Sequence, residues 1–144
     1  MTPIVEPHPD FRTRVQASFS RQAFMTTLGA SLQLMEPGEV HIQLLFSKHL
    51  AQQHGYMHAG AIAAVADSAN GYAALTLAPA DAEVLAVEFK INLMAPASAP
   101  RFLARGRVLR AGRRLSVCLA EVAAVNGPDQ VIATMLSTIS IRPA

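Results

Sequence analysis

A short segment in the middle of the chain carries the groups that could do chemistry. Asp67 lies in an alanine-rich stretch without proline that predicts a helix, where a carboxylate is costly unless it is paired or functional. The stretch begins at His58-Ala59-Gly60, whose small residues leave the first amide N–H groups of the helix open. These amides favour developing negative charge, as in an oxyanion hole. The alternative is a structural Asp67 that caps a backbone group or lies on a narrow polar strip.

The spacing of these two features limits how they could act together. Ala59 and Asp67 are eight residues apart, which is about 12 Å along a helix at about 1.5 Å per residue. One carbonyl carbon cannot touch both ends of that span. If both groups act on one substrate, they come from two antiparallel copies of the helix, as a two-fold homodimer provides.

The elements that must position this helix are mainly strands. Apolar residues at helical spacing predict one or two short helices between Phe11 and Leu28, and Gly29 is a stop signal. The long helix is predicted at 58–77. The predicted strands cover residues 32–35, 40–46, 84–92, 102–110, 115–125 and 131–141. A helix with so little polar face must be covered on most sides, so we expect an α+β fold whose curved antiparallel sheet wraps around it.

Length and composition suit one domain over residues 1–144, with a loose arm at 1–10. Hydrophobic residues make up 51% of the chain and charged residues only 15%. Few charges are therefore available to cover a monomer, and the protein either enters a membrane or buries surface against another copy. We expect a homo-oligomer, either a dimer or a dimer of dimers.

Several classes of protein are disfavoured. The segment 59–78 is about 20 residues long, enough to span a membrane, but Asp67 in its middle costs at least about 2.5–3.5 kcal/mol. The N-terminus lacks a signal-peptide pattern, and Cys118 is the one cysteine, so no internal disulfide can form. We expect a cytoplasmic protein. The net charge of +2 is too small to indicate nucleic-acid binding.

The segment from Gln52 to Leu77 resembles the helix segment of the PaaI-type thioesterases of the hotdog-fold superfamily. That family pattern is an Asn or Gln, a Gly three positions later, His-Gly-Gly, and an Asp or Glu eight residues after the first of those two glycines. This chain has Gln52, Gly55, His58-Ala59-Gly60 and Asp67 at the same spacings. The resemblance extends through residues 84–96 and the predicted hairpin at 111–114.

The resemblance implies a hotdog fold and hydrolysis of acyl-CoA thioesters, with coenzyme A as part of the substrate and no separate cofactor. It implies that Asp67 is a general base or nucleophile and that the Ala59 and Gly60 amides form the oxyanion hole. It also implies that Gln52 positions water or substrate, and that His58 holds the helix entry.

Three positions depart from the family pattern. Ala59 replaces the first motif glycine. Ala86 stands where some branches carry a serine, and Gly71 stands where another branch carries a threonine. Both missing hydroxyls orient water in the relatives. A non-catalytic acyl-CoA-binding or regulatory protein is therefore the alternative function, and the presence of Asp67 favours the enzyme.

Two further groups of residues could bind a ligand. No Asp or Glu occurs between Phe89 and Ala120, a segment rich in arginine. It is either a solvated strand face or a site for the phosphates of coenzyme A, which we assign to Lys90, Arg113 and Arg114. His54 and His58 have the spacing of helical zinc ligands, but Gly55 between them and the lack of a ligand set argue against a metal site.

Overall fold

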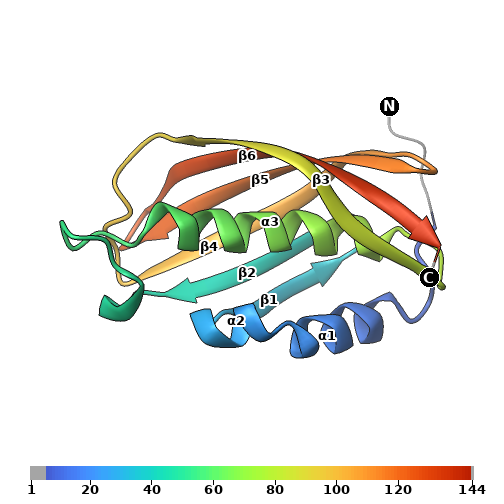
Figure 1. Ribbon diagram of the computed structural model, residues 1–144, viewed down its shortest axis with the longest axis horizontal. Coiled ribbons are helices and arrows are strands. Elements are labelled where there is room, and N and C mark those ends of the chain that lie inside the picture. The colour runs from blue at the N-terminus through green and yellow to red at the C-terminus, as the bar shows by residue number, and fades with distance from the viewer. Residues whose placement is uncertain (1–5, 144) are drawn as a thin grey trace.

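The computed structural model describes residues 6–143, and in this part of the chain a curved antiparallel sheet wraps around the long helix α3 (Figure 1). The strand order is β1-β2-β4-β5-β6-β3. In chain order the elements are α1 (Phe11–Arg21), α2 (Ala23–Leu28), β1 (Ser31–Glu36), β2 (Glu39–Leu45), a 3-10 turn (Lys48–Leu50), α3 (Ala59–Thr76), β3 (Ala82–Leu93), β4 (Arg101–Ala111), β5 (Leu115–Val125) and β6 (Asp129–Pro143). This is the α+β hotdog fold that the sequence predicts.

The N-terminal segment forms two short helices, as predicted. Of the arm expected at 1–10, residues 1–5 lie outside the described part of the chain, and α1 begins at Phe11. Gln22 separates α1 from α2 because its backbone is extended (φ −79°, ψ 97°), and α2 ends at Gly29. Val15 and Met25 are buried in the core, and α1 packs against α3 and β1 (Figure 1).

Helix α3 packs against the concave face of the sheet, with its backbone in direct contact with β4. Val40, Ile42 and Leu44 alternate inward along β2 and are fully buried, as their spacing predicts. At Gly106 of β4 a side chain is impossible, because an added Cβ would lie 2.4 Å from the carbonyl carbon of Ala69. The helix backbone therefore rests directly on β4, and this contact fixes its depth in the sheet.

Two polar contacts, one fully buried and one partly buried, fix the position of α3 along the sheet. Asn70 Nδ2 donates to Ser137 Oγ of β6 at 2.8 Å, and both residues are fully buried. Near the end of the helix, the backbone N–H of Gly38 donates to Thr76 Oγ1 at 2.7 Å. Buried polar groups that lose a partner cost about 1–3 kcal/mol, so these bonds disfavour any sliding of the helix.

The outermost strand β3 is the least buried part of the sheet. It pairs with β6 on one side and with no other strand of residues 6–143. Its large apolar side chains are nevertheless exposed, with Leu85 at 52%, Val87 at 59% and Phe89 at 46%. A long apolar edge strand is a ready site for pairing with another chain. Within residues 6–143, no helix is both long and apolar enough to cross a membrane.

Candidate active site

Asp67 lies on the side of α3 that the sheet leaves open. The partly or fully exposed residues of α3 follow helical spacing from its first turn to its middle, and all except Asp67 are small: Ala59, Gly60, Ala63, Ala64, Asp67, Ser68 and Gly71. The helix thus presents one narrow open stripe with a carboxylate in it. The sheet and α1 cover the remaining sides.

A cavity of about 260 Å³, called the Asp67 cavity below, lies between this stripe, the N-terminal helices and the start of β3. One side of it is apolar and the other is polar. Its lining residues are Ser18, Gln22, Asp67, Ser68, Gly71, Tyr72, Val84, Leu85, Ala86 and Ile139. Ala86 and Gly71 are the two positions where the family pattern has a hydroxyl, so both missing hydroxyls fall in this cavity.

The Asp67 side chain makes no hydrogen bond or ion pair with any residue between 6 and 143, and its Oδ1 is buried. The capping role that was the structural alternative is therefore not present. Loss of solvent raises the pKa of the Asp67 carboxyl above its ordinary value of 3.8. A buried carboxyl without a hydrogen-bond partner lowers the stability of the fold, and such groups are found most often at functional sites.

A chain of hydrogen bonds, called the polar network below, lines the polar side of the Asp67 cavity. Ser68 Oγ donates to Gln22 Oε1 at 3.1 Å, and Gln22 Nε2 donates to the Tyr72 hydroxyl at 2.9 Å. Ser18 Oγ also donates to that hydroxyl, at 3.3 Å. The sequence did not indicate these residues, because Ser18 and Gln22 lie far from Asp67 in the chain and form no local pattern with it.

His58 caps the first turn of α3. Its Nδ1 accepts the backbone N–H of Gly60 at 2.7 Å, so it holds the helix entry. A side chain at Gly60 would disturb this cap, because its Cβ would lie 2.9 Å from His58 Nδ1. The sequence assigned the Ala59 and Gly60 amides together to an oxyanion hole. The Gly60 N–H already donates to His58 and is therefore engaged. The Ala59 N–H has no hydrogen-bond partner among residues 6–143, so it is the one available to a ligand.

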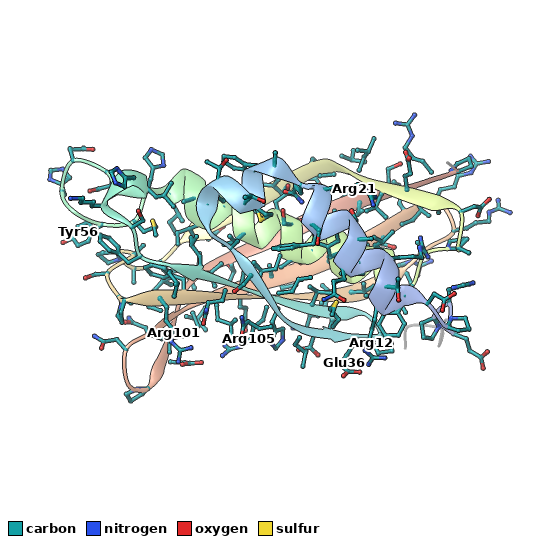
Figure 2. All side chains as sticks on the ribbon, turned by 90° about the horizontal axis from the view of Figure 1, so that it is seen from below. Arg12, Arg21, Glu36, Tyr56, Arg101 and Arg105 are labelled. Carbon is teal, nitrogen blue, oxygen red and sulfur yellow. The ribbon has the colours of Figure 1, made fainter. Side chains whose placement is uncertain are left out.

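A second cavity, of about 400 Å³, lies at this helix entry and is called the Ala59 cavity below. It is lined by Gln52, Tyr56, Met57, Ala59, Ile62, Ile132 and residues 93–97. Gln52 Oε1 accepts the backbone N–H groups of His54 and Tyr56, at 2.6 and 3.2 Å, and so shapes the loop before the helix. Its Nε2 donors remain without a partner among residues 6–143. Figure 2 shows Tyr56 at one end of the molecule.

The two cavities share no lining residue. One chain therefore brings Gln52 and Ala59 together and leaves Asp67 in a different cavity further along the helix. This is the separation that the spacing of Ala59 and Asp67 predicts. A single substrate carbon can reach both groups only if another copy of the chain supplies one of them.

The three basic residues assigned to coenzyme A do not form one cluster. Arg113 and Arg114 are exposed in the hairpin between β4 and β5, and Arg113 lines a cavity of about 480 Å³ at the C-terminal end of α3. Leu115 of β5 pairs with Ser140 of β6, and Ser140 pairs with Leu85 of β3, which lines the Asp67 cavity. The hairpin therefore lies two strand spacings, roughly 10 Å, from the wall of that cavity. Lys90 lies apart from it, exposed in the middle of β3.

Other basic residues of the same segment serve the outer face of the sheet. Arg101 Nη1 donates to Gln43 Oε1 of β2 at 3.1 Å, and Arg105 forms an ion pair with Asp129. Figure 2 shows both arginines along the strands below the helices. For Arg101 and Arg105 the solvated-face interpretation therefore holds.

No group of three or more His, Cys, Asp or Glu side chains in the described part of the chain is placed to hold a metal ion. The Nδ1 of His58 is already used in the helix cap. Cys118 is fully buried in β5, and loss of solvent raises the pKa of its thiol to about 12. A thiol with so high a pKa is inert at neutral pH, as expected of a core residue.

Known proteins share this architecture. Residues 54–130, just over half of the chain, match the family model of the thioesterase superfamily. A thioesterase family protein from Silicibacter pomeroyi is 41% identical, with a TM-score of 0.91 over 93% of this chain and 99% of that one. The conserved protein PA5202 from Pseudomonas aeruginosa is 28% identical, with a TM-score of 0.77 over 83% of this chain and 94% of that one.

The PaaI protein of the Escherichia coli phenylacetic acid degradation operon has the same fold at 20% identity, with a TM-score of 0.83 over 94% of each chain. No curated protein is similar enough to match.

Proposed function

The chain belongs to the thioesterase superfamily, and from this membership and the Asp67 cavity we propose that it hydrolyses acyl-CoA thioesters to a free acid and coenzyme A. The observation that carries the proposal is the state of Asp67. It is the one carboxylate of α3, it faces a cavity, it has no partner among residues 6–143, and burial raises its pKa. A carboxylate in this state is suited to accept a proton or to attack an electrophile.

Two chemical routes use the same residues. In the first, Asp67 takes a proton from water as the water oxygen attacks the thioester carbon. In the second, an Asp67 oxygen attacks that carbon and water then hydrolyses the resulting anhydride. In both, the carbonyl oxygen becomes an oxyanion and the C–S bond then breaks. The leaving thiolate takes the proton held by Asp67 in the first route and a proton from water in the second. The free Ala59 amide supports the oxyanion, and the Nε2 donors of Gln52 position water or substrate.

We propose that the complete site forms between two copies of the chain. Residues 84–86 of β3 line the Asp67 cavity, and residues 93–95 line the Ala59 cavity. If two β3 edges pair antiparallel about an axis at Phe89, residues 84–86 of one copy lie opposite residues 94–92 of the other. The same pairing brings the Asp67 cavity of one copy against the Ala59 cavity of its partner.

Two features support pairing at this edge. The large apolar side chains of β3 are exposed, and β3 is long enough to accept a full partner strand. The open stripe of α3 carries only small residues beside Asp67, so a second chain can approach the helix closely. Pairing would therefore remove from water the apolar surface that the low charge content leaves uncovered.

The test of the proposed function is Asp67→Asn, which keeps the shape of the side chain and removes its charge. We expect kcat on the best acyl-CoA of a panel from short-chain to aromatic to fall about 10²–10⁴-fold, the usual contribution of a positioned base. The wild-type rate should also fall at acid pH as Asp67 takes up a proton. Gln52→Ala should cost less, because it removes an orienting contact.

Asp81→Asn is the matched control, because Asp81 is an exposed aspartate in the turn after α3. It should leave kcat unchanged. Near-normal turnover of Asp67→Asn would make Asp67 a structural residue and overturn the proposal.

The second candidate is a protein that binds acyl-CoA without hydrolysing it. It is favoured by one observation, the absence of a hydroxyl at Ala86 and Gly71 in the wall of the Asp67 cavity. Tight binding of acyl-CoA together with no turnover across the panel would favour this candidate over the enzyme.

A further inference from the structure

The Asp67 cavity contains hydroxyl groups, although none comes from Ala86 or Gly71. They belong to Ser18 of α1 and to Ser68 and Tyr72 of α3, and all three line the cavity together with Asp67. Ser68 and Tyr72 lie one and five residues after Asp67, at positions outside the helix motif described above. The polar side of the cavity is therefore built partly by a segment outside the helix motif.

Gln22 connects these hydroxyls. Both ends of its amide are engaged, with Oε1 accepting from Ser68 at 3.1 Å and Nε2 donating to Tyr72 at 2.9 Å. The extended backbone between α1 and α2 is what places Gln22 over α3. Figure 2, seen from the side of the N-terminal helices, shows α1 running across α3 to Arg21, the residue before Gln22.

Tyr72 is held in place on its other sides. It is 6% exposed, and its ring contacts Phe19 of α1 with the ring centroids 5.9 Å apart. Its oxygen accepts from Gln22 Nε2, so its own proton is directed either to Ser18 Oγ at 3.3 Å or to a molecule in the cavity. A rigid hydroxyl whose proton can turn toward a cavity is a preorganised donor.

We propose that Gln22, Ser68 and Tyr72 position the water that attacks the acyl group, and that the N-terminal helices are therefore part of the active site. The inference rests on the proposed function. Water in this cavity donates one proton to the Asp67 carboxylate and accepts from the Tyr72 hydroxyl, which leaves its second lone pair to face the carbonyl carbon. The polar network thus does the work of the missing hydroxyls at positions 71 and 86 in the general-base route, in which Asp67 is a free carboxylate when water attacks.

Tyr72→Phe is the sharpest test, because it removes one oxygen and keeps the ring against Phe19. We expect it to lower kcat about 10–100-fold with KM within about twofold, since a positioning group acts mainly on the chemical step. Gln22→Ala should have a similar effect. The double variant should cost little more than either single variant, because both remove the same network.

A second readout separates positioning from simple support of the fold. Loss of a nearby hydrogen-bond donor disfavours the ionised form of Asp67 and raises its pKa. The acid limb of the pH–rate profile should therefore move to higher pH in Tyr72→Phe and in Gln22→Ala. A merely structural contact would lower the melting temperature and leave that limb in place. Gln16→Ala is the matched control, because Gln16 is an exposed glutamine of α1 whose side chain makes no hydrogen bond with residues 6–143.

The outcomes distinguish this inference from the proposed function. Full activity of Asp67→Asn would overturn the proposed function itself. If Asp67→Asn is inactive while Tyr72→Phe, folded and dimeric, matches Gln16→Ala in kcat and in pH profile, the function stands and the positioning role of the network is refuted.

Discussion

At the scale of single residues, Asp67 and Asn70 show how differently two neighbouring polar groups of one helix can be used. Each has a buried oxygen without a hydrogen-bond partner among residues 6–143. Asn70 is nevertheless tied to the sheet through its Nδ2, which donates to Ser137. Asp67 faces a cavity and is tied to nothing in the described chain. The first arrangement fixes the helix, and the second leaves a reactive group free at a cost in stability.

That cost predicts how stability depends on pH. Burial raises the pKa of Asp67 above 3.8, so between this value and the raised pKa the folded chain keeps a proton that the unfolded chain has lost. The contribution of Asp67 to stability therefore falls as pH rises through this window and stays low at neutral pH. Asp67→Asn should raise the melting temperature at pH 7 by a few degrees.

Thermal unfolding of wild type, Asp67→Asn and Asp81→Asn between pH 3 and 8 checks this prediction. The advantage of Asp67→Asn should shrink as the pH approaches 3.8, and Asp81→Asn should show no advantage at any pH. An Asp67→Asn variant that is less stable than wild type at neutral pH would show that the carboxylate is stabilised by its surroundings.

At the scale of elements, the hairpin between β4 and β5 is the segment that we propose binds the phosphates of coenzyme A. It presents Arg113 and Arg114 to solvent and lies two strands from Leu85 in the wall of the Asp67 cavity. The planar fork of an arginine can make two hydrogen bonds to one phosphate, and exposed arginines hold phosphate in a salt-dependent way. The cavity beside Arg113 at the end of α3 offers room for part of a nucleotide.

Arg113→Ala and Arg114→Ala should therefore raise KM for acyl-CoA several-fold, with a smaller effect at high salt. Both should matter far less for an acyl thioester that lacks the nucleotide. Lys90→Ala tests the third assigned residue in the same way, and Arg107→Ala, an exposed arginine on the outer face of β4, is the control. Equal effects on both substrates would indicate lost packing and no phosphate contact.

At the scale of the whole molecule, one chain has two separate cavities and an exposed strand edge between them. The Asp67 and Ala59 cavities lie toward opposite ends of β3, whose outer edge is unpaired in the described chain and whose Val87 and Phe89 side chains are exposed. A two-fold axis through the middle of β3 would bring each of these cavities against the unlike cavity of the other copy. The proposed dimer would therefore contain two equivalent complete sites.

Phe89→Arg tests this assembly, because Phe89 is 46% exposed and lies at the proposed axis, where it would meet its own copy. The two introduced guanidinium groups repel each other, so sedimentation at micromolar concentration should show a shift from dimer to monomer, with loss of turnover although Asp67 is intact. Leu45→Arg, at a leucine 53% exposed at the end of β2, should stay dimeric and active. A clean monomer that still hydrolyses thioesters would contradict the shared site.

The amino-acid sequence alone predicts the long helix that contains Asp67, the strands and the β4–β5 hairpin, because apolar spacing and turn residues are local signals. It also predicts that Ala59 and Asp67 of one chain cannot touch the same substrate carbon, because helical rise is fixed. The position of β3 beyond β6 at the edge of the sheet, and the packing of α1 over α3 that brings Gln22 and Ser18 to the Asp67 cavity, became visible in the folded chain. Only the folded chain shows that His58 occupies the Gly60 amide. These features depend on packing between distant segments and on side-chain conformation, and neither leaves a periodic pattern in the chain.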